Sequence, residues 1–486
     1  MILPTHNKSI AASILIIIND LRSFSLIGSM KKTLILLTCL ALMAFGYFGL
    51  NDGPVPIPPS KQRGGGDPKK GFQYLVYGDY VRSGLPINVF RMGFTRFDSS
   101  LLPRTGINAN IPYDFNALQQ KNGQVIVAPN CLQCHAMPFE GKLVMGLGNA
   151  GVDFTKSRGI NAGSVAMIER MLKKNFPEDY ESAKTFLTVT KTIAPDLVAD
   201  VRGVNLADHL AALLVAHRDP ETFRWSDTAL MEKNHAVIPT DTPPWWLLKK
   251  KNAMFYNGFG RGDFGRFLMA SNLLTTGDTS ESRVVDEHMP DLLAYIFSLK
   301  APAYPKAIDR PLAAKGKPLF EARCASCHGT YGAKGSYPNL LIPGSIVQTD
   351  SMLYASNYST PQFVAWFNRS WFRSGDHPAE LAPSNGYVAP PLDGIWISAP
   401  YLHNGSVPTL EAVLNSRIRP RYWSRDFKRP QYNYGSPGWV YKEESAGGKP
   451  DIYNTDLTGY SNRGHYFGDA LTDAERKAVI EYLKTL

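Results

Sequence analysis

Two short motifs hold most of the residues that could do chemistry in this chain of 486 residues. Both read Cys-x-x-Cys-His, once at Cys131–His135 and once at Cys324–His328. Two thiols at this spacing can form thioether bonds to the two vinyl groups of one haem, and the histidine that follows can then bind the iron. The pattern predicts two covalently bound haem c groups, attached at Cys131, Cys134, Cys324 and Cys327, with His135 and His328 as iron ligands.

A zinc site and a redox-active dithiol are the alternatives for such motifs. A zinc site would need further cysteine ligands, but the one remaining cysteine, Cys39, lies in an apolar run near the N-terminus. The body of the chain has no cysteine outside the two motifs, so neither a disulfide nor a free catalytic thiol is expected there. Haem is therefore the better interpretation of both motifs.

The group opposite each of these histidines decides what the haem can do. Two protein ligands on one iron favour electron transfer, whereas an open face can bind dioxygen or peroxide. For the second haem we expect His465, because it follows Gly464 and lies just before the C-terminal helix. His403 is the alternative ligand, and a surface or propionate-bonded histidine is the alternative role for either residue.

No residue stands out as the second ligand of the first haem. Met137 and Met145 follow the first motif, but a methionine in such a place more often packs than binds iron. His209 and His217 lie on a predicted helix, where a single histidine usually has a structural role. This pattern is consistent with an open, reactive first haem.

Short elements are expected to deliver the motifs and to close each half of the chain. A helix over 316–324 precedes the second motif, whereas the strand-like segment 123–128 precedes the first. Amphipathic helices over 286–299 and 472–486 end the two halves. The last helix begins with a Thr-x-x-Glu capping box.

These elements predict a mainly α fold with two cytochrome c-like haem domains and long irregular loops. We expect an N-terminal haem domain over 71–300, with a large insertion that contains a helix over 205–216. A C-terminal cytochrome c domain is expected over 301–486. The stretch 418–460 is rich in Arg, Tyr, Pro and Gly, and we expect an ordered loop over a haem edge, or surface.

The segment 1–50 is typical of an export signal or a membrane anchor. Two lysines precede the uncharged, apolar run 33–50, which is long for a signal and just long enough to span a bilayer. Signal cleavage and a membrane tether through 33–50 are both compatible with this run, and both predict a periplasmic body. Residues 51–70 combine Pro, Gly and charge without periodicity, which predicts a linker.

The formal charge of +10 does not indicate nucleic-acid binding. Residues 1–70 hold eight Lys and Arg against three Asp, a net +5 that leaves only +5 for the body. Two haems would add about four negative propionates. A nearly neutral body lacks the basic surface that nucleic-acid binding requires, so no nucleic-acid partner is expected.

The late segment 399–405 (APYLHNG), the following Thr409-Leu410-Glu411 and the closing Leu-Thr-Asp-x-Glu helix resemble the bacterial dihaem cytochrome c peroxidase superfamily. The resemblance covers roughly 120–486. Within it, 242–246 (TPPWW), 254–258 (MFYNG) and Gly464-His465 are similar to the branch that contains the dihaem rubber oxygenases.

The resemblance implies that the C-terminal haem relays electrons while the N-terminal haem is the reactive one. It places His465 as the second ligand of the C-terminal haem, where the peroxidases usually have methionine, and it implies no iron-binding role for His403. It also implies an electron relay between the haems at Trp245 or Trp246, although a Trp pair after a Pro-Pro turn is equally consistent with a core anchor.

Phe255 and Tyr256 could line the open haem pocket or pack in the core. No acid or amide in the pattern is evidently poised to cleave a peroxide O–O bond, which argues against peroxidase activity in particular. The leading hypothesis is a periplasmic dihaem enzyme that activates peroxide or dioxygen and exchanges electrons with a small redox protein or a respiratory partner. The alternatives are a non-catalytic electron-transfer cytochrome and a rubber-oxygenase-like dioxygenase acting on a hydrophobic substrate.

Overall fold

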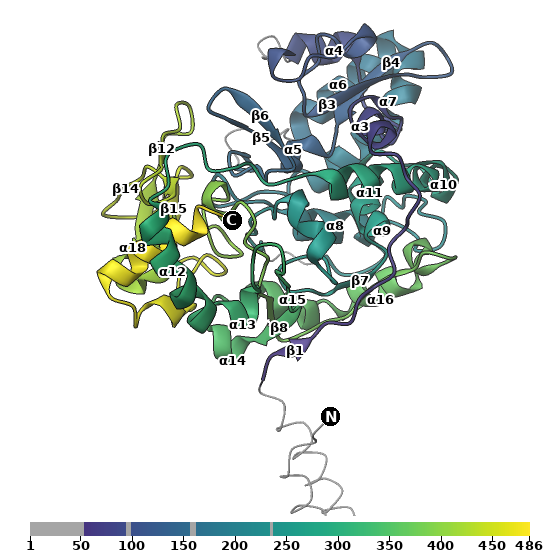
Figure 1. The fold of residues 1–486 in the computed structure, drawn as a ribbon. Helices are drawn as coiled ribbons and strands as arrows, with labels where there is room; N and C mark the ends of the chain where they lie inside the picture. The colour runs from purple at the N-terminus through teal and green to yellow at the C-terminus, as the bar shows by residue number, and fades with distance from the viewer. Residues whose placement is uncertain (1–52, 94–98, 156–161, 234–236) are drawn as a thin grey trace, which may run out of the picture. The chain divides into compact units, whose positions relative to one another are not determined.

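The computed structural model describes residues 53–93, 99–155, 162–233 and 237–486. The predicted export signal or anchor at 1–50 lies outside these ranges. Residues Pro54–Leu486 form one compact unit (Figure 1). Within the described ranges, we find no helix with the length and apolar character that a bilayer crossing requires.

The first half of the unit combines helices with short strands, two of which, β1 and β7, pair with strands of the second half. Its helices are α3 (Pro68–Tyr77), α4 (Ile87–Gly93), α5 (Leu132–His135), α6 (Ala162–Asn175), α7 (Pro177–Ile193), α8 (Ala207–Ala216), α9 (Phe264–Leu268), α10 (Thr279–Glu287) and α11 (Met289–Ser298). Its strands are β1 (Val55–Pro56), β2 (Leu85–Pro86), β3 (Phe115–Gln119), β4 (Val125–Pro129), β5 (Ala136–Phe139), β6 (Lys142–Met145) and β7 (Gly260–Gly262).

The second half has the same mixture of helices and short strands. Its helices are α12 (Arg310–Arg323), α13 (Ala325–His328), α14 (Gly344–Val347), α15 (Met352–Ser359), α16 (Pro361–Arg369), α17 (Leu410–Leu414) and α18 (Asp473–Leu483). Its strands are β8 (Leu340–Pro343), β9 (Ala379–Leu381), β10 (Gly386–Val388), β11 (Tyr422–Ser424), β12 (Tyr432–Asn433), β13 (Gly438–Trp439), β14 (Lys442–Glu443) and β15 (Ile452–Asn454).

The expectation of a mainly α fold is met only in part, because two- and three-stranded sheets accompany the helices. One of these sheets delivers the first motif. Strand β4 pairs with β2 and β3 in the order β2-β4-β3 and leads directly into α5, which carries the first motif's histidine. The strand predicted at 123–128 is therefore confirmed.

A helix delivers the second motif, as the sequence predicted. Helix α12 ends at the motif and packs against α18, beside which it lies in Figure 1. The two helices approach so closely at Gly316 that a Cβ there would lie 1.9 Å from the carbonyl oxygen of Ala478. The capping box of α18 is also confirmed, since Thr472 and Glu475 each bond to the other's backbone N–H.

The predicted helix over 286–299 is wrong in its boundaries. The structure has α10 and α11 in its place, separated at His288. Pro290 lies in the first turn of α11, where its lack of an N–H costs nothing, but inside a longer helix it would remove a hydrogen bond. The stretch 418–460 also has more order than a loop, because β14, β11 and β15 form a sheet and β12 pairs with β13.

Both large apolar cores contain side chains from before and after residue 300. The core around Trp245 and Leu293 includes Trp366 and Phe372 from the second half. The core around α12 and α18 includes Phe139 and Trp246 from the first half, together with Met137 and Leu247. The two halves therefore share their interiors.

The segment predicted as a linker is instead packed along the body from Val55 onward. We call residues 55–66 the strap. Strand β1 pairs with β8, which lies next to it in Figure 1, and Ile57 is buried. The composition of the strap predicted a linker. Its packing could not be predicted, because the segments that it contacts are far away in sequence.

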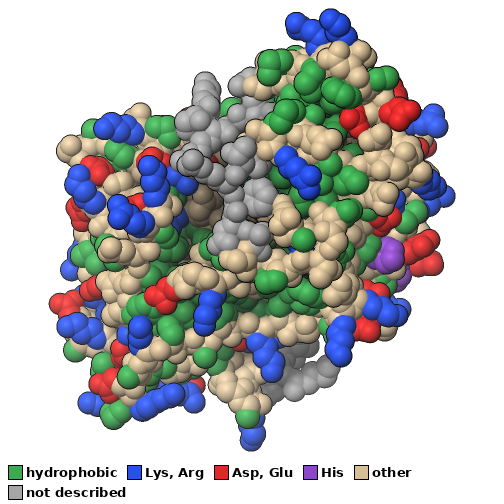
Figure 2. Space-filling model, turned by 90° about the horizontal axis from the view of Figure 1, so that it is seen from above, with side chains coloured by type: hydrophobic (Ala, Val, Ile, Leu, Met, Phe, Trp, Pro, Cys, Tyr) green, Lys and Arg blue, Asp and Glu red, His purple; other side chains and the backbone are tan. Residues whose placement is uncertain are grey.

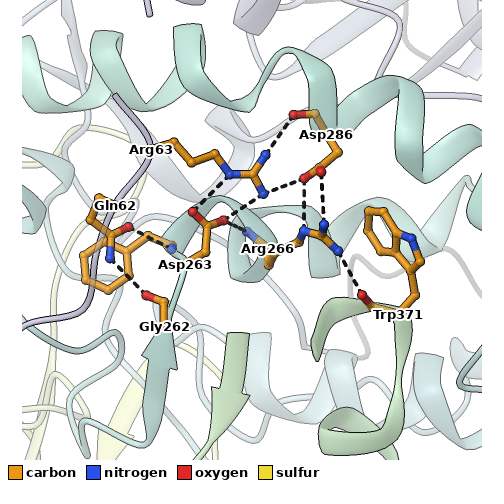
Figure 3. Close-up of polar contacts among 8 residues, drawn as sticks. Gln62, Arg63, Gly262, Asp263, Arg266, Asp286 and Trp371 are labelled. Carbon is orange, nitrogen blue, oxygen red and sulfur yellow. Dashed lines mark hydrogen bonds and ion pairs between the residues drawn. The ribbon is translucent and has the colours of Figure 1, made fainter. Parts of the chain in front are cut away.

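Arg63 fixes the far end of the strap (Figure 3). Its guanidinium makes two hydrogen bonds to the Asp263 carboxylate, of 2.9 and 3.0 Å, and one of 2.6 Å to Asp286. Arg266 binds the same Asp286 carboxylate at 3.1 Å and stacks on the Trp371 ring, whose centre lies 3.8 Å from the guanidinium carbon.

On the face shown in Figure 2, Lys and Arg side chains are interspersed with acidic and apolar ones.

Candidate haem-binding sites

A cavity of about 330 Å³ surrounds the second motif. Its wall contains Cys324, Cys327 and His328 of the motif together with His465 from the loop before α18. Most of the remaining wall is apolar and comes from α12, α17, α18 and the turns around 387–402. Two thiols and two imidazoles that share one apolar cavity are the set that an attached, six-coordinate haem requires.

His328 and His465 are spaced as ligands on opposite sides of one iron would be. Their ring centres lie 6.1 Å apart, with 60° between the ring planes. Two imidazoles bound to one metal have centres about 6.2 Å apart, since each metal–nitrogen bond is about 2.0 Å and each centre lies about 1.1 Å behind its nitrogen. The geometry therefore fits a haem iron between His328 and His465.

Both imidazoles are also held in the neutral form that binds metals. Nδ1 of His328 lies 2.8 Å from the carbonyl oxygen of Pro390, to which it donates, so Nε2 is available to the iron. Burial lowers the pKa of His328, and it lowers the pKa of His465 to about 3. Neither ring is protonated near neutral pH, and metal ligation requires an unprotonated nitrogen.

The loop that carries His465 depends on Gly464, because a side chain at this position would collide with protein backbone. Gly464 has φ +80°, and a Cβ there would lie 2.2 Å from the backbone nitrogen of Thr349, so the loop presses on protein backbone. The N–H of His465 donates to Val347 at 2.7 Å. Arg419 also donates to the carbonyl oxygen of Gly464 at 2.7 Å, which fixes the loop.

His403 lines the same cavity, but its ring is already engaged. Its Nε2 lies 3.0 Å from the Tyr387 hydroxyl, and the two rings stack with centres 4.2 Å apart. The same hydroxyl donates its single proton to the carbonyl oxygen of Asp350 at 2.6 Å. Nε2 of His403 must therefore carry a proton and donate to the hydroxyl oxygen, which favours His465 as the iron ligand.

At the first motif, the side chains of Cys131, Cys134 and His135 keep some accessible surface although protein surrounds them deeply. The accessible surface that remains on these three side chains is what an attached haem would cover. Burial lowers the pKa of His135 to about 3, so this imidazole is also neutral. The hairpin of β5 and β6 returns Gly146 to the motif, where its N–H donates to His135 at 2.8 Å.

Trp245 and Trp246 connect the two motifs. The Trp245 ring stacks on His135, with centres 4.5 Å apart and 18° between the planes. The indole N–H of Trp246 donates at 2.8 Å to Asp393, which lies in the wall of the second cavity three residues after Pro390. The two adjacent tryptophans thus contact the surroundings of different haem sites.

The other candidates for the first haem have structural surroundings. Met137 is buried in the core shared with the second half, and Met145 ends the hairpin opposite Ala136. Nε2 of His209 lies 2.9 Å from the carbonyl oxygen of Asp196, and Nδ1 of His217 lies 2.9 Å from that of Ser226. His217 also stacks on Trp225. Among the described candidates, none is therefore assigned as a second ligand opposite His135.

Three polar residues in the wall of the second cavity were not expected there. The Tyr256 hydroxyl donates to the Asp241 carboxyl at 3.1 Å, and Lys251 lies in the same wall. Burial raises the pKa of Asp241 to about 8 and lowers the pKa of Lys251 to about 8. Asp241 directly precedes the Thr-Pro-Pro-Trp-Trp segment, and this position was the one sequence feature that could have indicated its place in the cavity wall. Phe255, by contrast, packs among core aromatic rings.

Sequence comparisons show which known families parts of the second half are similar to. Residues 313–371 match the model of the family "Cytochrome c", and residues 386–424 match the model "RoxA-like, cytochrome c-like". Over these residues the chain is similar to cytochrome c domains, which implies covalently bound haem c and suggests a haem-based redox function.

Two curated relatives come from Sinorhizobium fredii (strain NBRC 101917 / NGR234). The uncharacterized protein y4iM is 28% identical over 306 residues, which cover 53% of this chain and 68% of the relative. The uncharacterized protein y4iJ is 40% identical over 111 residues, which cover 21% of this chain and 18% of the relative. Neither name assigns an activity.

Proposed function

We propose that the protein is a periplasmic dihaem oxidoreductase in which the N-terminal haem binds peroxide or dioxygen. The C-terminal haem then exchanges electrons with a small redox protein or another respiratory partner. One observation carries this proposal: His465 stands opposite His328 at an iron-binding separation, whereas no residue in the described part of the chain is assigned as a partner of His135. An iron with an unfilled axial position is the one that can bind a small oxidant.

The protein's own residues support this division of labour. His328 and His465 would hold one iron from both sides, and the apolar cavity wall keeps water away. Trp245 lies against His135, and Trp246 reaches the wall of the second site, so the pair offers a short route for electrons between the haems. Haem iron, when bound, supplies the one-electron chemistry.

Optical and electron paramagnetic resonance spectra of the isolated protein test the proposal. We expect two haems per chain, one low-spin and one with an open or weakly bound position that reacts rapidly with peroxide or dioxygen. His465→Ala should leave both haems attached and turn the low-spin haem high-spin. His403→Ala is the matched control in the same cavity and should keep that haem low-spin. Two low-spin haems in every redox state would contradict a catalytic role.

A dioxygenase that cleaves a hydrophobic substrate is a second candidate function. The match of residues 386–424 to a "RoxA-like, cytochrome c-like" model favours it. Incubation with polyisoprene in the presence of dioxygen, followed by product analysis, distinguishes the two candidates. Oxygenated cleavage products would support the dioxygenase, and turnover of peroxide alone would support a peroxidase-like reaction.

A further inference from the structure

A deeply placed arginine follows strand β11 and is held between aromatic rings. The guanidinium carbon of Arg425 lies 4.3 Å from the centre of the Trp439 ring and 4.5 Å from that of Phe427. One of its N–H groups donates to the carbonyl oxygen of Ala150. Aromatic rings and a carbonyl group orient a guanidinium, but they do not neutralise its charge.

Among the described residues, no carboxylate lies within ion-pair distance of Arg425. The neighbouring Arg202 does have acidic partners, at 3.6 Å from Asp153 and 3.7 Å from Asp451. Arg202 also lies over the same Phe427 ring at 4.3 Å, so two guanidinium groups share one aromatic side chain. Burial, together with the positive charge of Arg202, lowers the pKa of Arg425 to about 9, which still leaves it charged at neutral pH.

The nearby Asp241 does not supply the missing negative charge. It lies close enough to Arg425 for their charges to interact, but not within the distance of an ion pair. With a pKa of about 8, its carboxyl group is mostly protonated at neutral pH. A cation that protein surrounds without a counter-charge is unfavourable, so an anion from outside the polypeptide is expected there.

Arg425 lies near both haem motifs. Its hydrogen-bond acceptor, Ala150, follows Asn149, whose N–H donates at 2.9 Å to Cys134 of the first motif. On the other side, Pro400 belongs both to the cavity around the second motif and to the small cavity that Arg425 lines. Each attached haem carries two propionate carboxylates.

We propose that Arg425 binds the propionate carboxylate of one of the two haems. Two N–H groups of a guanidinium match a carboxylate in geometry and in charge, which lysine does not. The bound propionate neutralises Arg425, and the arginine in turn stabilises electron uptake by that haem. The proposal depends on haem attachment but not on the reaction at the first haem.

The test compares Arg425→Gln with Arg421→Gln, a control for an exposed arginine at the other end of β11. Redox titration gives the midpoint potential of each haem, and resonance Raman spectra report the propionate bending bands. We expect Arg425→Gln to lower one haem's potential, so that its ferrous-to-ferric ratio at fixed potential falls about tenfold, or about 59 mV. The propionate band of the same haem should shift, and Arg421→Gln should change neither quantity.

The haem whose midpoint potential and propionate band change is the one whose propionate Arg425 binds. The measurement therefore distinguishes the haem at His135 from the haem at His328. Unchanged potentials and bands at both haems would overturn the proposal. A potential shift without a band shift would also overturn it, because a charge acting at a distance gives that result. If Arg425→Gln fails to fold, Arg425→Lys keeps the charge but loses the two-point contact, and unchanged bands there would equally overturn it. Peroxide reactivity is measured separately, so failure of the proposed reaction leaves this outcome readable.

Discussion

The histidines of this protein differ in what their ring nitrogens contact, and that difference separates their roles. His328 donates from Nδ1 to a backbone carbonyl and presents Nε2 to a cavity. In His403 the nitrogen that would bind iron is engaged by Tyr387. His209 and His217 are bonded to carbonyl oxygens outside the two motifs. His328 and His217 make the same bond from Nδ1 to a backbone carbonyl, so what marks His328 as a ligand is that it lines a cavity opposite His465.

Trp245→Phe should slow electron transfer between the haems by about tenfold or more, because phenylalanine keeps the stacking on His135 but is far harder to oxidise. Flash photolysis of the carbon monoxide-bound, half-reduced protein measures the rate. Trp225→Phe is the matched control, since Trp225 stacks in the same way on His217, with ring centres 4.8 Å apart. Equal rates in the two variants would remove Trp245 from the relay.

At the scale of secondary-structure elements, the strap is held by charged side chains that are buried. Arg63 and Asp263 are both almost fully buried, with 4% and 1% of their side chains exposed. Such a pair contributes little net stability, but removal of one partner leaves the other buried and uncompensated. The strap is therefore sensitive to a single substitution in a way that its Pro- and Gly-rich composition does not suggest.

Arg63→Ala should lower the free energy of unfolding by about 3–5 kcal/mol, because it leaves the Asp263 and Asp286 carboxylates without their shared cation. Denaturant titration measures the change. Lys61→Ala, two residues away and exposed, should alter the free energy by less than about 0.5 kcal/mol. Equal effects of both substitutions would show that the strap is not fixed through Arg63.

The elements that the sequence predicts correctly are those whose signals are local. The Cys-x-x-Cys-His motifs, the capping box at Thr472 and the strand before the first motif are all defined within a few residues. Arg63 and Arg425 carry no such signal, because the groups to which they donate hydrogen bonds lie about 200 residues or more away along the chain. Asp241 owes its raised pKa to burial, which the identity of its sequence neighbours does not reveal.

On the scale of the whole molecule, the halves before and after residue 300 do not have separate interiors. Phe139, four residues after the first motif, packs edge-on against Trp396 and Tyr432 of the second half. Trp366 and Phe372 of the second half lie in the core around Trp245. The arrangement couples the stability of one haem site to that of the other.

Phe139→Ala should cost about 3–5 kcal/mol and should lower the unfolding midpoints of both haem sites together, because the lost ring belongs to a shared core. Unfolding followed at the absorption bands of each haem measures the two midpoints. Phe176→Ala, at a side chain that is 53% exposed, is the control and should move neither midpoint. A shift at the first haem alone would show that the halves unfold independently.

The strap also constrains the order in which the protein can mature. Its contacts join residues near the start of the chain to Asp263, Asp286 and β8, so they cannot form until those later segments have arrived. Contacts between residues so distant in sequence form slowly and late, because a long loop must close first. The strap therefore remains unfolded until these later segments are in place. During that interval the motif cysteines are more accessible than the half-buried side chains of the finished protein.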